Sequence, residues 1–308
     1  MQYINGLEAF SGTGRSAVTL GKFDGLHRGH QKLVERVTEY SRMDGINSIV
    51  CSFDMEPLYR RLERPYQVLM TKAERQMHLE DQVDYLVDCP FTETFSQMSA
   101  EDFIRDVLAG LFHADYVVVG TDFHFGHQKR GDIHMLAAYQ DQYNYQLEVV
   151  DKERYEGREI SSTFVKEALA AGKMDLVETL LGYPYGVEGT VEHGKKLGRT
   201  LGFPTFNVEP PKEKLLPPNG VYLEQVEVDG KWYNAIGNLG VKPTVTDNGR
   251  MLIESYLLYY SDNAYGKQVK IRFKSFRRPE QKFRDVAEMK RHVEQDIACG
   301  REFFARLK

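Results

Sequence analysis

Two histidines, His27 and His30, stand three residues apart in the stretch V-T-L-G-K-F-D-G-L-H-R-G-H, which covers residues 18–30. A short apolar run precedes them, and apolar residues at helical spacing follow them. This spacing places both imidazoles on one side of a first helical turn, where free backbone N–H groups favour an anion. Two imidazoles at that point can stabilise the negative charge that develops on a leaving phosphate group. The stretch therefore predicts a nucleotide-phosphate site.

Three glycines in the same stretch, Gly21, Gly25 and Gly29, let the backbone approach a ligand closely. Histidines at this spacing also occur as ordinary surface residues at a polar turn, and some bind zinc. The preceding strand pattern and the glycines favour the phosphate site over the surface turn. A zinc site is disfavoured because no cysteine or further histidine lies at ligand spacing.

The elements that must position these residues alternate between strand and helix patterns in the first half of the chain. Expected strands cover residues 17–20, 46–53, 84–87, 115–120 and 146–150, and expected helices open at residues 71, 99, 131 and 162. The segment with Pro57 and Pro65 is expected to be a loop. The alternation predicts an α/β fold, a mostly parallel sheet with helices on both faces. Because ligands bind at the carboxyl ends of strands in such sheets, the loops 21–30, 121–131 and 160–163 are expected to converge.

The second half of the chain changes period after Gly182. Glycine, proline and β-branched or aromatic residues dominate until about Phe283, and Asp229-Gly230 between two strand patterns is a strong hairpin signal. Short strands with turn signals between them predict a small antiparallel β-barrel. A final helical pattern covers residues 284–307. The expected domains are residues 1–182 and 183–308.

A second dense motif, G-K-K-L-G-R-T-L-G-F-P-T-F-N, covers residues 194–207. A loop rich in glycine and cations can wrap a triphosphate, since lysine and arginine offset its charge. Thr205 and Asn207 offer uncharged oxygens that suit Mg²⁺ bridging to phosphate. A basic turn at the surface is the ordinary alternative, and the length of the string favours the phosphate loop.

The 308 residues carry a net charge of −5, so no overall positive field recruits nucleic acid or an anionic membrane. No apolar run approaches the ~20 residues that span a bilayer. The first ten residues lack the basic flank and apolar core of a signal peptide. Cys51, Cys89 and Cys299 form neither a metal spacing nor a disulfide framework, which fits a reducing cytoplasm. The expected partners are therefore small molecules, and the oligomeric state is left open.

The motif G-K-F-D-G-L-H-R-G-H resembles the H-x-G-H signature of the nucleotidylyltransferase superfamily, and more narrowly that of the bacterial bifunctional riboflavin kinase/FAD synthetase family. The strings V-G-T-D-F-H-F-G at 119–126 and I-S-S-T at 160–163 resemble two further motifs of that family. The resemblance implies a Rossmann-like first domain in which His27 and His30 are catalytic and Asp122 and Phe123 bind flavin. The ATP-binding residues that it implies in this domain are Gly21, Phe23, Asp24, Gly25, Gly29, Ser161, Ser162, Thr163 and Lys166.

The string at 194–207 resembles the riboflavin kinase motif of the same family, and Glu254 in I-E-S-Y-L-L matches the family's catalytic glutamate. A glutamate on a strand usually faces solvent, but this one is expected to accept a proton from the ribityl hydroxyl of riboflavin. The resemblance further implies that Arg278 binds flavin and that Thr205 and Asn207 hold the metal. The ATP-binding residues that it implies in this domain are Gly194, Lys195, Gly198, Arg199 and Gly202.

The resemblance implies two reactions: phosphorylation of riboflavin to FMN by ATP in the second domain, and adenylylation of FMN to FAD with release of pyrophosphate in the first. Mg²⁺ is the implied cofactor, ATP a substrate, and FMN and FAD are substrate and product. The chain departs from the family pattern at residues 55–56 and at Lys166, Phe206 and Lys242. Two alternatives therefore stay open. Either only one module is active, with a monofunctional FAD synthetase as the first choice, or the protein is a flavin-binding regulator with idle sites.

Overall fold

The computed structural model describes residues 1–192, 202–242 and 249–307. The chain divides into two compact units, residues 1–162 and residues 163–308. Each unit has its own sheet, so each is described by itself.

The first unit is built on a six-stranded sheet with the order β1-β4-β3-β2-β5-β6. Every pair of neighbouring strands in this sheet is parallel, which confirms the expected architecture. The strands are β1 (Gln2–Asn5), β2 (Ser16–Gly21), β3 (Asn47–Asp54), β4 (Tyr85–Pro90), β5 (Ala114–Gly120) and β6 (Gln146–Val150). A small hairpin of β7 (Arg154–Tyr155) and β8 (Arg158–Glu159) follows the sheet.

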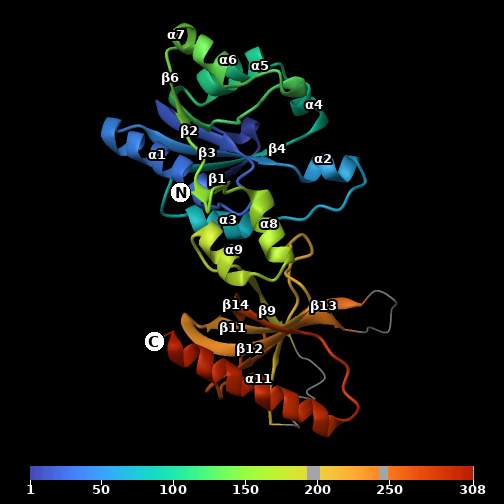
Figure 1. Cartoon of the computed structure of the whole chain (residues 1–308). Coiled ribbons are helices and arrows are strands. Elements are labelled where there is room, and N and C mark those ends of the chain that lie inside the picture. The colour runs from blue at the N-terminus through green and yellow to red at the C-terminus, as the bar shows by residue number, and fades with distance from the viewer. Residues whose placement is uncertain (193–201, 243–248, 308) are drawn as a thin grey trace. The chain divides into compact units, whose positions relative to one another are not determined.

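Helices cover both faces of this sheet (Figure 1). Helix α1 (Arg28–Asp44) packs on one face through Leu33, Val34 and Val37, and the π-helix η2 (Phe103–Leu111) packs on the other. The remaining helices of this unit are short: η1 (Leu7–Ala9), α2 (Glu56–Arg61), α3 (Lys72–Leu79), α4 (Glu93–Ser96), α5 (Ala100–Asp102), η3 (His127–Lys129), α6 (Ile133–Ala138) and α7 (Gln140–Tyr143). Two of the expected helix starts are confirmed by their caps, because Thr71 and Glu74 form a capping box and Ser99 caps α5.

The expectation of a loop after β3 was wrong in part, because α2 lies there. Pro57 stands in the first turn of this helix, where its missing N–H costs no helical hydrogen bond. The neighbouring N–H of Glu56 is satisfied by the Asp54 carboxylate at 3.0 Å. Strand β1 was also not expected; it joins the sheet edge beside β4.

The strand order reverses direction at β2. From β2 the chain adds β3 and β4 on one side, and it later adds β5 and β6 on the other. The gap between the carboxyl ends of β2 and β5 is therefore a topological switch point, where open α/β sheets bind ligands. The loop that carries His27 and His30 follows β2, and the loop that carries Asp122 follows β5.

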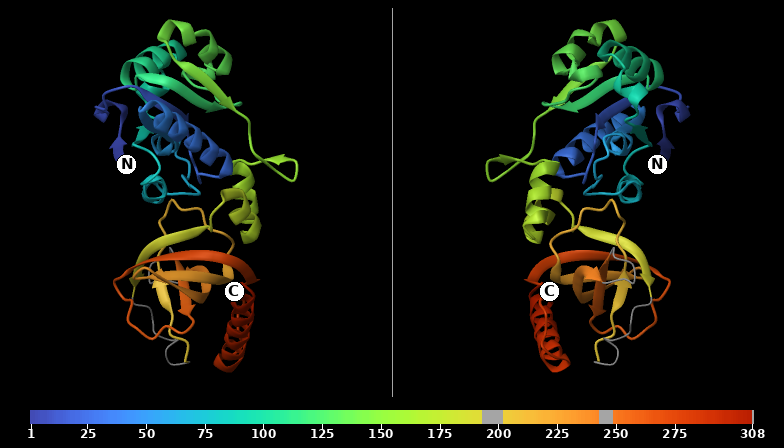
Figure 2. Two further views of the ribbon diagram at one scale, coloured as in Figure 1. Left: turned by 90° about the vertical axis from the view of Figure 1, so that its left-hand side faces the viewer. Right: turned by 90° about the vertical axis from the view of Figure 1, so that its right-hand side faces the viewer.

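The second unit contains a closed antiparallel barrel with the order β10-β13-β12-β11-β14-β9, as expected (Figure 2). Its strands are β9 (Gly186–Glu192), β10 (Phe206–Val208), β11 (Gly220–Val228), β12 (Lys231–Lys242), β13 (Arg250–Leu257) and β14 (Gln268–Pro279). The Asp229-Gly230 hairpin is confirmed, since both residues have the positive φ that this turn requires. Helices α8 (Ser162–Ala170) and α9 (Met174–Leu181) precede the barrel, and α11 (Val286–Arg306) packs against it through Ile297 and Phe304.

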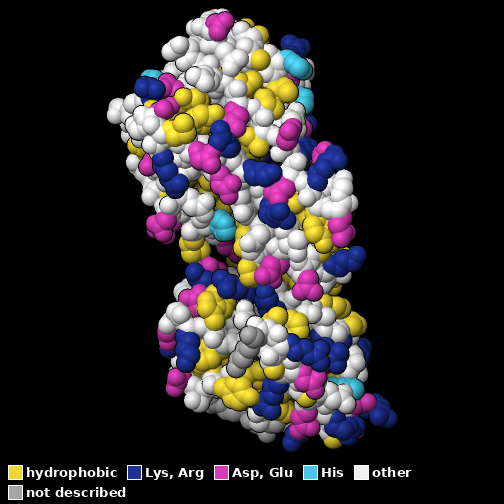
Figure 3. All heavy atoms as spheres, turned by 60° about the vertical axis from the view of Figure 1, so that its left-hand side comes forward, with side chains coloured by type: hydrophobic (Ala, Val, Ile, Leu, Met, Phe, Trp, Pro, Cys, Tyr) yellow, Lys and Arg dark blue, Asp and Glu magenta, His cyan; other side chains and the backbone are white. Residues whose placement is uncertain are grey.

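No helix in the described part of the chain is both long enough and apolar enough to cross a membrane. On the face drawn in Figure 3, Lys and Arg side chains are interspersed with Asp and Glu. This mixed surface agrees with the modest net charge of −5.

Candidate active sites

The loop after β2 turns sharply and starts helix α1. His27 is the N-cap residue of this helix, and its carbonyl accepts the backbone N–H groups of His30 at 2.7 Å and of Gln31 at 3.0 Å. The loop is therefore closed by its own backbone, and it presents the first turn of α1 at the carboxyl edge of the sheet.

The two imidazole rings stack on each other, with their centroids 3.7 Å and their planes 20° apart. Burial lowers the pKa of His27 to about 4, and burial together with the neighbouring His27 lowers the pKa of His30. Both rings are therefore neutral at neutral pH. The Nδ1 atoms of both are enclosed and have no hydrogen-bond partner among the described residues. Two neutral imidazoles suit hydrogen bonding to a ligand better than they suit charge pairing.

The backbone of this loop adopts left-handed conformations at two residues that carry large side chains. Phe23 has φ 46° and Leu26 has φ 38°, and both side chains are fully buried. This conformation costs about 1 kcal/mol per non-glycine residue. The Phe23 ring also lies 5.1 Å from the ring of His30, so the buried side chains hold the loop under the histidines.

Gly29 lies between the histidines because there is little room for a side chain. A Cβ atom at this position would lie 3.3 Å from Cε1 and Nδ1 of His27. Asp24 fixes the loop from its other side: its carboxylate accepts the N–H of Leu69 at 2.7 Å, and its carbonyl accepts the hydroxyl of Ser162 at 2.8 Å. Asp24 and Gly29 therefore lie beside His27, and Ser162 is hydrogen-bonded to Asp24; their contact with ATP stays a prediction.

Asp122 and Phe123 lie at the neighbouring carboxyl end, directly after β5. Asp122 is exposed and forms an ion pair with Lys152 at 2.8 Å. The ring of Phe123 is partly buried and stacks on that of Phe125, with centroids 5.6 Å apart. These residues reach the switch point, and their contact with flavin stays a prediction.

The I-S-S-T stretch lies at the boundary of the two units. Ser161 and Ser162 end the first unit, and Ser162 is also the first residue of α8, which carries Thr163 and Lys166 in the second unit. The joint role of these four residues in one phosphate site stays a prediction.

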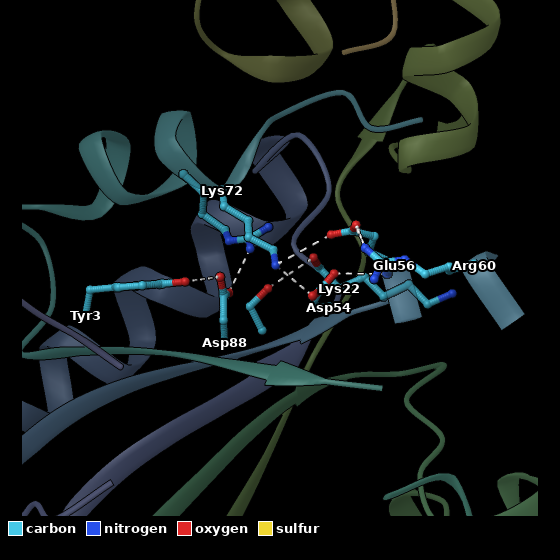
Figure 4. A network of polar contacts seen from close by, with 9 residues as sticks. Tyr3, Lys22, Asp54, Glu56, Arg60, Lys72 and Asp88 are labelled. Atoms are coloured by element: carbon cyan, nitrogen blue, oxygen red, sulfur yellow. Dashed lines mark hydrogen bonds and ion pairs between the residues drawn. The ribbon is translucent and has the colours of Figure 1, made fainter. Parts of the chain in front are cut away.

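A polar network at the end of β3 was not expected from the sequence (Figure 4). The buried carboxylate of Asp54 binds the ammonium of Lys72 at 2.7 Å, and Lys72 also lies 3.9 Å from Glu56. Burial is the largest cause of the raised pKa of Tyr66, and the carboxylates of Asp54 and Asp24 raise it further. Both carboxylates therefore lie near Tyr66. The departure from the family at residues 55–56 is thus accompanied by an internal ion pair. Nothing in local sequence spacing signals it, because Lys72 comes from α3.

In the barrel, Asn207 and Glu254 stand directly opposite each other in the antiparallel pair of β10 and β13. Directly opposed residues share one face of a sheet, so the expected metal ligand and the expected base lie side by side. The Glu254 carboxylate also binds the ammonium of Lys242 at 2.7 Å. Phe206 pairs with Ser255 and lies on the opposite face from Asn207, away from the expected metal ligand.

Four of the five expected ATP-binding residues of the kinase motif, Gly194, Lys195, Gly198 and Arg199, lie outside the described residues. Gly202 is described; it has φ 88°, and no atom lies within 4 Å of the position of a Cβ. Thr205 lies two residues before Asn207 and is half-buried. Arg278 on β14 binds the buried carboxylate of Asp296 on α11 at 2.7 Å, so its expected contact with flavin stays a prediction.

A second buried acid, Glu224, was missed by sequence reasoning. Its side chain lies inside the barrel, where one carboxylate oxygen accepts the hydroxyl of Ser255 at 2.7 Å. The other oxygen has no partner among the described residues, and a Cβ atom at Gly237 would lie 2.1 Å from this carboxylate. Burial raises the pKa of Glu224 to about 8. The alternation of β11 does place this residue inward, and that is the signal that could have found it.

Comparisons with known proteins agree with this geometry. A family model described as FAD synthetase matches residues 11–164, and one described as riboflavin kinase matches residues 181–304. A relative named bifunctional riboflavin kinase/FMN adenylyltransferase from Listeria monocytogenes is 34% identical, covering 94% of this chain and 93% of the relative. A relative of the same name from Pseudomonas fluorescens is 33% identical, covering 99% of this chain and 98% of the relative. Another from Escherichia coli K12 is 32% identical, covering 100% of this chain and 99% of the relative.

A solved structure described as a macrolide-efflux protein from Streptococcus pneumoniae has a TM-score of 0.86 and 27% identity, covering 97% of this chain and 98% of that one. The likeness extends over both units, and the two family models match in the order expected from the sequence. The chain therefore belongs to the bifunctional riboflavin kinase/FMN adenylyltransferase family.

Proposed function

We propose that the two modules catalyse consecutive steps, with the residues described above in separate roles. The barrel module phosphorylates riboflavin with ATP to give FMN and ADP. The α/β module then transfers AMP from a second ATP to FMN, which gives FAD and pyrophosphate. Both family models and the full-length relatives support this bifunctional interpretation over a single active module or a flavin-binding regulator. We place the domain boundary at residues 182 and 183.

The stacked pair of neutral imidazoles carries the proposal for the α/β module. A phosphate oxygen of FMN attacks the α-phosphorus of ATP, and the bond to the pyrophosphate oxygen breaks. His27, His30 and the first turn of α1 stabilise the charge that moves onto the pyrophosphate. No covalent enzyme intermediate is needed, because positioning and charge stabilisation suffice. Asp122 and Phe123 are the proposed flavin contacts of this module. The proposed ATP contacts are Gly21, Phe23, Asp24, Gly25, Gly29, Ser161, Ser162, Thr163 and Lys166.

The pairing of Asn207 with Glu254 carries the proposal for the barrel. Glu254 accepts the proton of the ribityl hydroxyl as that oxygen attacks the γ-phosphorus of ATP, and ADP leaves with the electron pair of the broken bond. Thr205 and Asn207 would hold Mg²⁺, since both offer oxygen ligands beside the base. When bound, Mg²⁺ offsets the charge of the transferred phosphoryl group. Arg278 is the proposed flavin contact in this module. Localisation in the cytoplasm stays a prediction.

A paired test separates the two steps. Riboflavin and Mg-ATP are supplied, and FMN and FAD are followed by chromatography. We expect His27→Ala to stop at FMN and Glu254→Gln to make FAD only from supplied FMN. Absence of both products with the wild-type chain would contradict the enzyme function, and loss of both activities in either variant would contradict the division of labour.

A further inference from the structure

The neutral histidines do not offset the negative charge of a bound triphosphate. A triphosphate and the pyrophosphate that leaves it carry several negative charges, which cationic groups usually offset. Burial keeps both imidazoles uncharged at neutral pH, so they donate or accept hydrogen bonds without adding positive charge. The cation within the first turn of α1, Arg28, is already paired with Glu153, so a further cation of the α/β module is needed there.

Lys152 is a lysine whose charge acts on His27. It follows β6, the strand beside β5, at the same carboxyl edge of the sheet as the histidine loop. Burial is the largest cause of the lowered pKa of His27, and the carboxylate of Asp24 opposes it. The ammonium of Lys152 lowers this pKa by a smaller amount. The next residue, Glu153, forms an ion pair with Arg28, which directly follows His27 in α1. The segment that carries Lys152 is thus fastened to the helix that carries the histidines.

The ion pairs that Lys152 forms in this structure are weak enough for a ligand to replace them. Its ammonium binds Asp122 at 2.8 Å and Glu159 at 3.1 Å, and these two carboxylates are 69% and 45% exposed. Exposed ion pairs contribute little to stability, because water solvates the carboxylates well. Phosphate oxygens, with more charge, can therefore displace both carboxylates from the ammonium.

We propose that Lys152 is a phosphate-binding residue of the adenylyltransferase site, whose ammonium leaves Asp122 and Glu159 to bind the pyrophosphate portion of ATP. The inference rests on the proposed transfer of AMP to FMN. In that step the new bond joins an FMN phosphate oxygen to the α-phosphorus, and the electron pair of the broken bond goes to pyrophosphate. Lys152 stays protonated throughout and offsets the charge that accumulates there.

Arg154 provides a matched control. It lies two residues further along, is 61% exposed and binds the same Glu159 at 3.1 Å. Its charge is not among those that shift the pKa of His27. A variant of Arg154 therefore removes a neighbouring cation and its ion pair with Glu159, and it leaves in place Lys152, the cation that acts on His27.

The test uses Lys152→Gln, Lys152→Arg and Arg154→Gln in the full chain. FAD formation from FMN and Mg-ATP is measured, and so is the reverse reaction of FAD with pyrophosphate. We expect Lys152→Gln to raise KM for ATP and for pyrophosphate about tenfold, as loss of one charge-assisted contact does, while KM for FMN stays near the wild-type value. Lys152→Arg should recover most of the loss, and Arg154→Gln should resemble wild type. Unchanged KM values for ATP and pyrophosphate in Lys152→Gln, or an equal loss in Arg154→Gln, would overturn the inference.

Two further measurements do not depend on catalysis. Removing the Lys152 charge should raise the pKa of His27 in an NMR titration, and removing the Arg154 charge should not move it. In the wild-type chain, saturating Mg-pyrophosphate should protect Lys152 from reductive methylation, as read by mass spectrometry; equal labelling with and without pyrophosphate counts against the inference. FAD formation by wild type together with wild-type behaviour of Lys152→Gln would refute only this inference, whereas absence of FAD formation by wild type would refute the proposed function itself.

Discussion

The ammonium of Lys242 lies 2.7 Å from the carboxylate of Glu254 and joins β12 to β13 beside the buried Asn207. Both side chains are about one-third exposed, so the pair contributes little to stability. Its effect is to fix the direction in which the carboxylate points. The ion pair therefore matters more for the orientation of the proposed base than for the free energy of unfolding of the barrel.

Replacing Lys242 tests this orienting effect. We expect Lys242→Met to lower kcat for riboflavin phosphorylation about tenfold, because a misplaced base loses much of its effect. Lys242→Arg should keep most of the activity, since it preserves the charge. FAD formation from supplied FMN should be unchanged in both variants. Wild-type kcat in Lys242→Met would show that the carboxylate is oriented by other contacts.

Gly29→Ala tests the close approach of the backbone to His27. The new methyl group would press on the ring from 3.3 Å, so the ring must shift. Because small misplacements at a reacting centre are costly, we expect FAD formation to slow about tenfold or more. Alanine is a good helix former, so the helix itself should be retained. Formation of FMN from riboflavin serves as the internal control, and full FAD synthetase activity would contradict the tight fit.

The neutral state of the histidine pair can be observed directly. Since burial lowers the pKa of His27 to about 4 and also lowers that of His30 well below its ordinary value, neither ring should titrate as the pH falls from 8 to 6. The imidazole ¹⁵N shifts of both residues should stay at the values of the neutral form over this range. Assignment of the signals by Gln substitution at each position completes the measurement. A midpoint near 6.5 for either ring would contradict it.

Glu224 should make the barrel less stable as the pH rises. Its pKa is raised from the ordinary 4.5 to about 8, so between these values the folded state keeps a proton that the unfolded state has released. Stability therefore falls as the pH rises from 4.5 to about 8, by an amount of about 5 kcal/mol at most. Glu224→Gln keeps the shape and a partner for Ser255 but removes the titration, so its advantage over wild type should grow with pH.

The single tryptophan, Trp232, lies on β12 and reports unfolding of the barrel by fluorescence. Urea unfolding is measured at pH 5, 6.5 and 8 for wild type and Glu224→Gln. Glu227→Gln, on the same strand and partly exposed, is the matched control. If wild type and Glu224→Gln change in parallel with pH, the carboxyl group does not hold its proton in the barrel.

Local signals in the sequence predicted local structure well. The capping box of Thr71 and Glu74 and the Asp229-Gly230 turn formed as expected, because their hydrogen bonds and dihedral angles depend on residues a few positions apart. The short helix α2 lies in a segment expected to be a loop, because proline is tolerated in the first turn of a helix.

Contacts between distant segments could not be predicted in the same way. The opposition of Asn207 and Glu254 depends on the register of two strands that are far apart in sequence. The ion pair of Lys72 with Asp54 and the approach of Lys152 to His27 depend on how separate elements meet at one edge of the sheet. Spacing along the chain carries no information about such meetings.

The left-handed backbone at Phe23 and Leu26 has a consequence for engineering this enzyme toward heat resistance. Glycine would relieve the backbone at either position, but it would also delete a side chain that is fully buried. Deleting a large buried side chain costs ~2–5 kcal/mol, more than the relief returns. Thermostabilising substitutions in the α/β module should therefore be sought outside residues 21–30, because the left-handed backbone of that loop lowers the stability of the folded state.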